Sequence, residues 1–313
     1  MVKIIVGMMG SSVAGGSSQL STTQGVTSYL STISSHRIHE LDTARVYASG
    51  KSEELLGAVS ASNTFAISTK APAFAPQSLT AANIISNCNK SLQALNQPQV
   101  DIYYLHGPDR ATPLEEQCRA IAQLYTEGKF RRFGVSNISA DEVQRIHDIC
   151  TRESYPLPAV YQGGFNPIGR SAEAKLIPLC RKLGMAFYAF SPLAGGLLAK
   201  KLDDILHPAE GSRYQAMKVF GDIYLKENFL TALEMVREVC RKEGISVMEA
   251  TLRWFMHHSV LGERDGVVLG ASTTEQIEES LSACEKGKLP EEVVRAWERL
   301  WEDVKEDVMR MHG

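Results

Sequence analysis

The chain has 313 residues, of which 44% are hydrophobic and 22% are charged, and it carries a formal net charge of -3. This composition excludes a disordered chain, and the lack of basic excess gives no indication of binding to nucleic acid or to an anionic membrane surface. We find no signal-like N-terminus and no apolar window of about 18 residues, so we expect a cytoplasmic protein without membrane spans.

Short apolar runs rich in β-forming residues alternate with longer stretches of helical period. The predicted strands are residues 3–7, 38–44, 64–70, 100–107, 130–137, 159–163, 185–193 and 266–272. The predicted helices are residues 18–33, 52–59, 80–95, 114–128, 141–150, 173–183, 228–242, 246–258 and 274–285. The pattern therefore repeats a strand followed by a helix eight times.

Eight such units predict an α/β fold of the (β/α)8 TIM-barrel type, because each parallel strand needs a crossover and helices must cover the outer face. A doubly wound sheet is the competing topology, but the first strand ends without a Gly-x-Gly-x-x-Gly turn. Two segments fall outside the repeat: a long loop after strand seven, residues 194–226, and an added C-terminal helix beginning near Pro290. We expect one barrel domain over residues 1–313, with Trp297 and Trp301 of the added helix in its core.

The six cysteines lie 30 or more residues apart and form no Cys-x-x-Cys pair, which predicts buried, reduced thiols. A metal site formed by His36 and His39, or by His257 and His258, is a weaker alternative, because neither pair has the i, i+4 spacing of a helical zinc site. We therefore expect no metal.

Four residues with tunable chemistry follow successive predicted strands: Asp42 and Tyr47 after the second, Lys70 at the end of the third and His106 at the end of the fourth. In a parallel barrel the active site forms where the strands end, so these side chains are expected to converge. An ammonium favours the ionised form of a nearby phenol. Tyr47 is thus predicted to donate a proton, Lys70 to make it acidic, and Asp42 to hold Lys70, while neutral His106 hydrogen-bonds a substrate oxygen.

The later strand ends suit a large ligand. Ser136, Asn137 and Gln162 can recognise a carboxamide, and Phe190 can stack on a flat ring. Glycines after strand seven allow close approach of a pyrophosphate, with Lys200, Lys201 and Arg213 following. The stretch from Gly270 to Gln276 opens a helix whose N-terminus favours a phosphate.

Together these motifs resemble the aldo-keto reductase superfamily. They are Asp42-Thr-Ala-Arg-Val-Tyr47, Lys70, Tyr104-Leu-His106, Gly134-Val-Ser-Asn137, Tyr161-Gln162, Ser191-Pro-Leu-Ala-Gly-Gly-Leu197 and Gly270-Ala-Ser-x-x-Glu-Gln276. The chain is most similar to the aflatoxin-aldehyde (succinic semialdehyde) reductase branch. Members of this family are (β/α)8 barrels that reduce aldehydes and ketones with NADPH and without metal.

The resemblance implies roles for individual residues. It assigns a catalytic tetrad of Asp42, Tyr47, Lys70 and His106. It also implies that Phe190 stacks on the nicotinamide and that Ser136, Asn137 and Gln162 meet its amide. The resemblance implies further contacts with NADPH or NADP+ from Ser191, Leu193, Gly195, Leu197, Lys201, Arg213, Gly270, Ser272, Gln276 and Glu279.

We therefore expect an NADPH-dependent oxidoreductase that converts a small carbonyl substrate to an alcohol. The alternative is a cofactor-sensing regulatory subunit resembling the potassium-channel β subunits. The resemblance also implies that the chain can form a homodimer.

Overall fold

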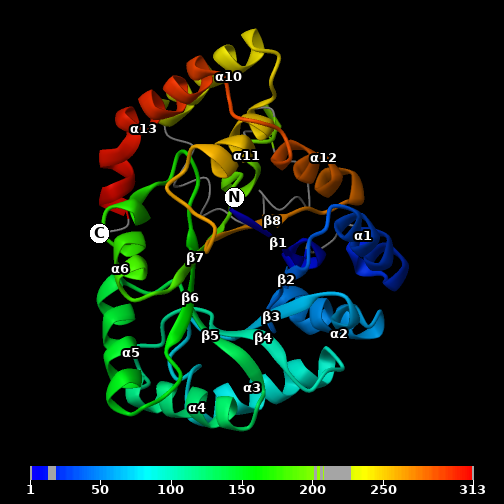
Figure 1. Cartoon of the computed structure of the whole chain (residues 1–313), viewed down its shortest axis with the longest axis vertical. Helices are drawn as coiled ribbons and strands as arrows, with labels where there is room; N and C mark the ends of the chain where they lie inside the picture. Colours follow the sequence, from blue (N-terminus) through cyan, green and yellow to red (C-terminus); the bar gives the residue numbers. More distant parts are fainter. Residues whose placement is uncertain (1, 13–18, 201–202, 205–206, 208–226, 312–313) are drawn as a thin grey trace.

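Eight parallel strands close into one barrel in the computed structural model, which describes residues 2–12, 19–200, 203–204, 207 and 227–311. Figure 1 shows the strands as a ring, in sequence order, with helices around its outside. The strands are β1 (Lys3–Gly7), β2 (Glu40–Asp42), β3 (Ala66–Ala71), β4 (Val100–Leu105), β5 (Phe130–Ser136), β6 (Pro158–Gly164), β7 (Ala186–Phe190) and β8 (Gly266–Gly270). The predicted barrel is confirmed.

Each of the α-helices given next corresponds to a predicted one. The helices are α1 (Thr23–Ser35), α2 (Lys51–Ala58), α3 (Ala81–Ala94), α4 (Leu114–Thr126), α5 (Ala140–Arg152), α6 (Leu176–Lys182), α10 (Glu227–Lys242), α11 (Val247–His257), α12 (Thr274–Cys284) and α13 (Glu291–Met311). The largest shift is at α1, which starts five residues after the predicted residue 18 because Thr22 caps it by accepting from the Gly25 N–H.

Apolar side chains fill both faces of the strands. A cluster of Ile5, Ile102, Tyr104, Val160, Tyr188 and Val268 is distinct from the larger core that the helices share with the sheet. Gly134 makes room for this cluster, because a Cβ atom there would lie 2.3 Å from the Tyr104 ring. The barrel is therefore a packed core that presents a rim, rather than a pore.

Parallel register brings the carboxyl ends of the strands to that rim. Gly7 at the end of β1 pairs with Asp42 on one side and with Gly270 on the other. Lys70 in β3 pairs with Tyr104 in β4, two residues before His106. Residues predicted to act together thus start from adjacent strand ends.

Helix α13 lies outside the eightfold repeat and packs against α10 (Figure 1). Trp297 is fully buried, and Glu298 pairs with Arg170 at 2.8 Å. Trp301 is half-buried against the same core. The predicted C-terminal helix is thus present, with one of its two tryptophans fully in the core. Most of the predicted loop 194–226 lies outside the described residues.

All six cysteines are buried and free of disulfide bonds, as predicted. Among the helices that the structure describes, none is both long enough and apolar enough to cross a membrane.

Candidate active site

Three neighbouring strands carry the predicted tetrad to one rim. Asp42 is the last residue of β2, Lys70 is the penultimate residue of β3, and His106 directly follows β4. Tyr47 begins a short 3-10 helix, Tyr47–Gly50, after β2. The side chains of Lys70 and Asp42 are 0% and 4% exposed, whereas Tyr47 and His106 are half-buried. A buried ion pair therefore lies beneath two groups that a substrate can reach.

The Lys70 ammonium connects the carboxylate to the phenol. Its Nζ donates to Asp42 Oδ2 at 2.5 Å and to the Thr43 backbone oxygen at 2.8 Å. It also lies 3.5 Å from the Tyr47 hydroxyl oxygen. The other oxygen of Asp42 accepts a hydrogen bond from Gln162 Nε2 at 2.8 Å. Asp42 and Tyr47 are thus linked through Lys70, in the arrangement expected from the sequence.

The charge on Lys70 is maintained by its partners. Burial alone would lower the pKa of Lys70, but interaction with Asp42 and with the ionised form of Tyr47 outweighs burial and raises that pKa. The ammonium is therefore present throughout the neutral pH range.

His106 is a neutral imidazole held between two aromatic rings. Its ring centre lies 5.9 Å from that of Tyr47 and 5.7 Å from that of Phe74, both in edge-on geometry. Burial, and then the positive charge of Lys70, lowers the pKa of His106 to about 3. A neutral imidazole keeps one N–H, so His106 can donate a hydrogen bond to an oxygen atom at this rim.

We expect His106 to make the fold sensitive to acid. Because its pKa is about 3 in the folded state against 6.5 ordinarily, the unfolded chain binds a proton that the folded chain does not bind between these values. Relative to His106→Gln, the wild type should lose up to about 1.4 kcal/mol of unfolding free energy for each pH unit below about 6. Urea unfolding of both proteins between pH 7.5 and 4.5 measures this difference, and parallel pH profiles would contradict it.

A buried ion pair lies under the loop that carries Tyr47, and the sequence did not reveal it. Glu53 in α2 is 0% exposed and accepts from Arg45 Nη1 at 2.5 Å and from Thr69 Oγ1 at 2.6 Å. Gly50, at φ +96°, leaves the space that the Arg45 guanidinium occupies, since a Cβ there would lie 1.7 Å from Nη2. Arg45 thus fastens the loop from Asp42 to Tyr47 onto α2.

The residues predicted to meet a nicotinamide lie at the ends of β5, β6 and β7. Asn137 Nδ2 donates to the His106 backbone oxygen and to Ser136 Oγ, both at 2.9 Å. Gln162 is directed at Asp42, as described above, and Phe190 is a half-buried ring at the end of β7. A carboxamide and a flat ring would find suitable partners here.

The turn after β7 has the backbone needed to approach a pyrophosphate. Positive φ occurs at Ser191, Ala194, Gly195 and Gly196, and a Cβ atom at Gly196 would meet only the flexible side chain of Lys200 among the described residues. The N–H groups of Ala194, Gly196 and Leu197 already donate to backbone oxygens within the turn, so what the turn offers a pyrophosphate is close approach of its backbone.

The other residues predicted to contact the cofactor near this turn differ in how exposed they are, and two of them are not described by the structure. Leu193 is half-buried, whereas Leu197 as a whole residue is only 1% exposed. Lys201 and Arg213 lie outside the described residues. Arg237 in α10, which the sequence did not indicate, donates to the backbone oxygens of Leu197 and Lys200 at 3.2 and 3.0 Å. It therefore fixes the turn from the side of α10.

The predicted adenosine end lies where β8 leads into α12. Gly270 closes β8 and Glu279 is exposed on α12. The helix start is already capped, because Gln276 Oε1 accepts from the Ser272 N–H at 3.0 Å and Gln19 Oε1 accepts from the Thr274 N–H at 2.8 Å. A phosphate bound here would replace one of these side-chain acceptors.

Phe74, in the loop after β3, is a further rim residue that sequence reasoning missed. Its φ of +74° is an uncommon, strained conformation for a bulky side chain, with a typical cost of about 1–3 kcal/mol. Its ring contacts His106 and occupies the place where a Gly107 side chain would lie, because a Cβ at Gly107 would come within 2.3 Å of it. No periodicity or motif in the sequence marks such a residue.

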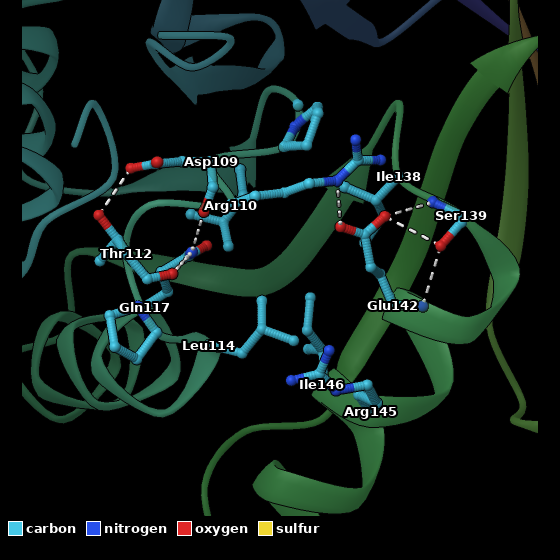
Figure 2. Close-up of a pocket in the computed structure, with 14 residues that line it drawn as sticks. Asp109, Arg110, Thr112, Leu114, Gln117, Ile138, Ser139, Glu142, Arg145 and Ile146 are labelled. Carbon is cyan, nitrogen blue, oxygen red and sulfur yellow. Dashed lines mark hydrogen bonds and ion pairs between the residues drawn. The ribbon is translucent and has the colours of Figure 1, made fainter. Parts of the chain in front are cut away.

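Asp109 ties the loop after β3 to the loop after β4. Its carboxylate accepts from the backbone N–H groups of Gln77 (3.0 Å), Leu79 (2.8 Å) and Ala111 (3.0 Å), and from Thr112 Oγ1 (2.7 Å; Figure 2). These hydrogen bonds hold the pKa of Asp109 below its usual value against the opposing effect of burial. The loop that follows His106 is therefore rigidly anchored.

A cavity of about 430 Å³ lies beside this anchor, between the loop after β4 and the start of α5. Figure 2 shows its apolar wall residues Leu114, Ile138 and Ile146, with Glu142 bonded to Ser139 and paired with Arg110. None of the four tetrad residues lines it. The four converging titratable groups thus lie at the barrel rim and not in this cavity.

The histidine pairs considered as metal ligands have other partners. His36 lies between Glu278 and Glu285, and His257 contacts the Lys286 backbone oxygen at 2.8 Å. Across the part of the chain that the structure describes, no group of three or more His, Cys, Asp or Glu side chains is placed to hold a metal ion.

Comparisons with known proteins agree with this geometry. The model of the aldo/keto reductase family matches residues 3–302. The chain is 42% identical to the oxidoreductase sirO of Leptosphaeria maculans, over 89% of this chain and 86% of that protein. It is 39% identical to aflatoxin B1 aldehyde reductase member 2 of Mus musculus (84% and 76% covered) and 38% identical to aldo-keto reductase family 7 member A3 of Homo sapiens (84% of both).

Proposed function

Since this chain belongs to the aldo/keto reductase family and is thus an oxidoreductase acting on carbonyl compounds, we propose that it reduces aldehydes or ketones with NADPH and that Tyr47 donates the proton. The observation that carries this proposal is the position of the Lys70 ammonium, 2.5 Å from Asp42 Oδ2 and 3.5 Å from the Tyr47 hydroxyl. The roles proposed for the other residues follow from the chemistry of each side chain at its position in the site.

Tyr47 gives its hydroxyl proton to the substrate oxygen as that oxygen gains negative charge. The Lys70 ammonium stabilises the phenolate that remains, and Asp42 keeps the ammonium charged and in place. His106, neutral because of its low pKa, donates a hydrogen bond that positions the same oxygen. When bound, NADPH supplies the hydride for the carbonyl carbon.

The residues at the later strand ends suit this cofactor. Phe190 offers a ring face to the nicotinamide, and Ser136, Asn137 and Gln162 offer polar groups to its amide. The positive-φ turn after β7, with Ser191, Leu193 and Gly195, suits the pyrophosphate. Gly270, Ser272, Gln276 and Glu279 suit the adenosine end. We assign Lys201 and Arg213 to the phosphates on the sequence resemblance alone.

The test is multiple-turnover kinetics. The purified protein should oxidise many equivalents of NADPH, followed at 340 nm, when given an aldehyde panel, and should do so faster than with NADH. One equivalent of cofactor oxidised per chain, followed by arrest, would instead favour the cofactor-sensing regulatory subunit. Turnover of NADH at an equal or greater rate would contradict the assignment of NADPH.

A further inference from the structure

The turn after β7, residues 191–200, is held at its first residue by the segment that follows β6. Asn166 is 2% exposed, and its Nδ2 donates to the Ser191 backbone oxygen at 3.2 Å. Next to it, the Phe165 N–H donates to the Phe190 backbone oxygen at 3.3 Å. Ser191 has a φ of +54°, which is strained for a residue other than glycine. Asn166 thus supports the strained first residue of the turn that we assign to the pyrophosphate.

Asn166 is itself held by a short antiparallel bridge with Gly169. The Gly169 N–H donates to the Asn166 backbone oxygen at 2.9 Å, and Asn166 Oδ1 accepts from the Ile168 N–H at 3.1 Å. Arg170 follows this bridge directly in the chain. A displacement of Arg170 is therefore transmitted to the Asn166 side chain.

Arg170 connects the bridge to the added C-terminal helix. Its Nη1 donates to both carboxylate oxygens of Glu298 in α13, at 2.9 and 2.8 Å, and its Nε donates to Glu173 Oε1 at 2.9 Å. The guanidinium carbon also lies 5.3 Å from the Trp254 ring centre and 5.7 Å from the Trp301 ring centre. With its side chain only 11% exposed, Arg170 is the point where α11, α13 and the segment after β6 meet.

A second connection reaches the other end of the same turn. Arg237 of α10 donates to the Leu197 and Lys200 backbone oxygens, and α10 packs against α13 (Figure 1). Both ends of the turn are thus held by partners that contact α13. Because α13 lies outside the eightfold repeat, closing the barrel does not explain these contacts.

We propose that α13 sets the affinity of the enzyme for NADPH from outside the cofactor site, with Asn166 and Arg170 as positioning residues that hold the turn after β7 in the conformation that receives the pyrophosphate. A turn that is held in advance loses less conformational freedom when the cofactor binds, which favours the bound state. The tetrad comes from β2 to β4 and keeps its geometry when this connection is loosened. The inference rests on the proposed use of NADPH and adds a determinant of its affinity.

The test measures NADPH affinity by fluorescence titration in wild type, Asn166→Ala, Arg170→Ala and the double variant. Each single change should raise the dissociation constant about three- to tenfold, which corresponds to the loss of one hydrogen-bonded contact. KM for NADPH should rise in parallel, while kcat at saturating NADPH changes less than about twofold. Since both residues belong to one connection, the double variant should bind about as weakly as the weaker single variant.

Glu298→Ala tests the contribution of α13 itself, and Glu302→Ala, one turn further along this helix, is its matched control. Glu298 accepts from Arg170, whereas the exposed Glu302 pairs with Lys305 on the same helix. Only Glu298→Ala should weaken NADPH binding, by about two- to fivefold, because its carboxylate is half exposed.

Urea unfolding of each variant separates affinity from stability. Lower stability of Asn166→Ala and Arg170→Ala, with dissociation constants for NADPH within about twofold of wild type, would make these contacts purely structural and overturn the inference. Losses that multiply in the double variant, or equal effects of Glu298→Ala and Glu302→Ala, would also overturn it. Should Arg170→Ala fail to fold, Arg170→Lys takes its place, because it keeps the charge and loses the paired hydrogen bonds to Glu298. A wild type that does not bind NADPH would overturn the proposed function, and the inference with it.

Discussion

Replacing Tyr47 by phenylalanine is expected to lower kcat for aldehyde reduction by about 10²- to 10⁴-fold, the range typical of a lost general acid. The substitution removes only the hydroxyl that lies 3.5 Å from Lys70 Nζ and keeps the ring that packs against His106. Without it none of the described residues at this rim offers a phenolic proton together with a cation beside it to stabilise the resulting anion. Steady-state kinetics with saturating NADPH measure the loss, and fluorescence titration with NADPH should show unchanged affinity.

Tyr104→Phe is the matched control for this experiment. Tyr104 is a second phenol near the same ammonium, with its ring centre 5.7 Å from Lys70 Nζ, but it is fully buried within the barrel. Because a substrate cannot reach it, its loss should leave kcat within about twofold of wild type. Near wild-type kcat in Tyr47→Phe, or equal losses in both variants, would refute Tyr47 as the proton donor.

The parts of the site that the sequence predicts are those whose positions follow from strand geometry. Asp42, Lys70 and His106 each close an apolar run, and parallel strands in a barrel deliver such ends to one rim whatever the loops do. A predicted strand is too long where its apolar run continues into the loop. The prediction covers residues 185–193, but β7 ends at Phe190. A run of hydrophobic residues indicates that a segment is buried, but it does not indicate where its last hydrogen bond to a neighbouring strand lies.

The residues that the sequence missed depend on contacts between loops. Glu53 follows the start of α2, where an acidic residue normally serves the helix dipole at the surface, yet it is fully buried against Arg45 and Thr69. The Phe74 N–H donates to the Pro108 backbone oxygen, and Asp109 accepts from Gln77 in the same loop. Arg237 approaches the turn after β7 from a distant helix. Such partners are adjacent only after the barrel closes.

Replacing Glu53 by alanine is expected to destabilise the fold by about 3–5 kcal/mol, which is the usual cost of removing one member of a buried ion pair. Among the described residues, Arg45, 19% exposed, would keep only the exposed Glu54 at 4.0 Å as an acidic neighbour. The Thr69 hydroxyl would lose its acceptor. Urea unfolding of wild type and variant gives the difference in unfolding free energy. Since Arg45 lies two residues before Tyr47, kcat should fall as well.

Glu54 provides the control for Glu53, because it is the next residue in the chain, has the same charge and is 54% exposed. Glu54→Ala should change the unfolding free energy by no more than about 0.5 kcal/mol. Glu53→Gln keeps the volume and an acceptor for Thr69 but removes the charge, so its loss should fall between those of the two alanine variants. Equal small effects at positions 53 and 54 would mean that the pair with Arg45 does not hold the loop. A loss of kcat in Glu53→Gln without loss of stability would instead locate the contribution of Arg45 in the placement of Tyr47.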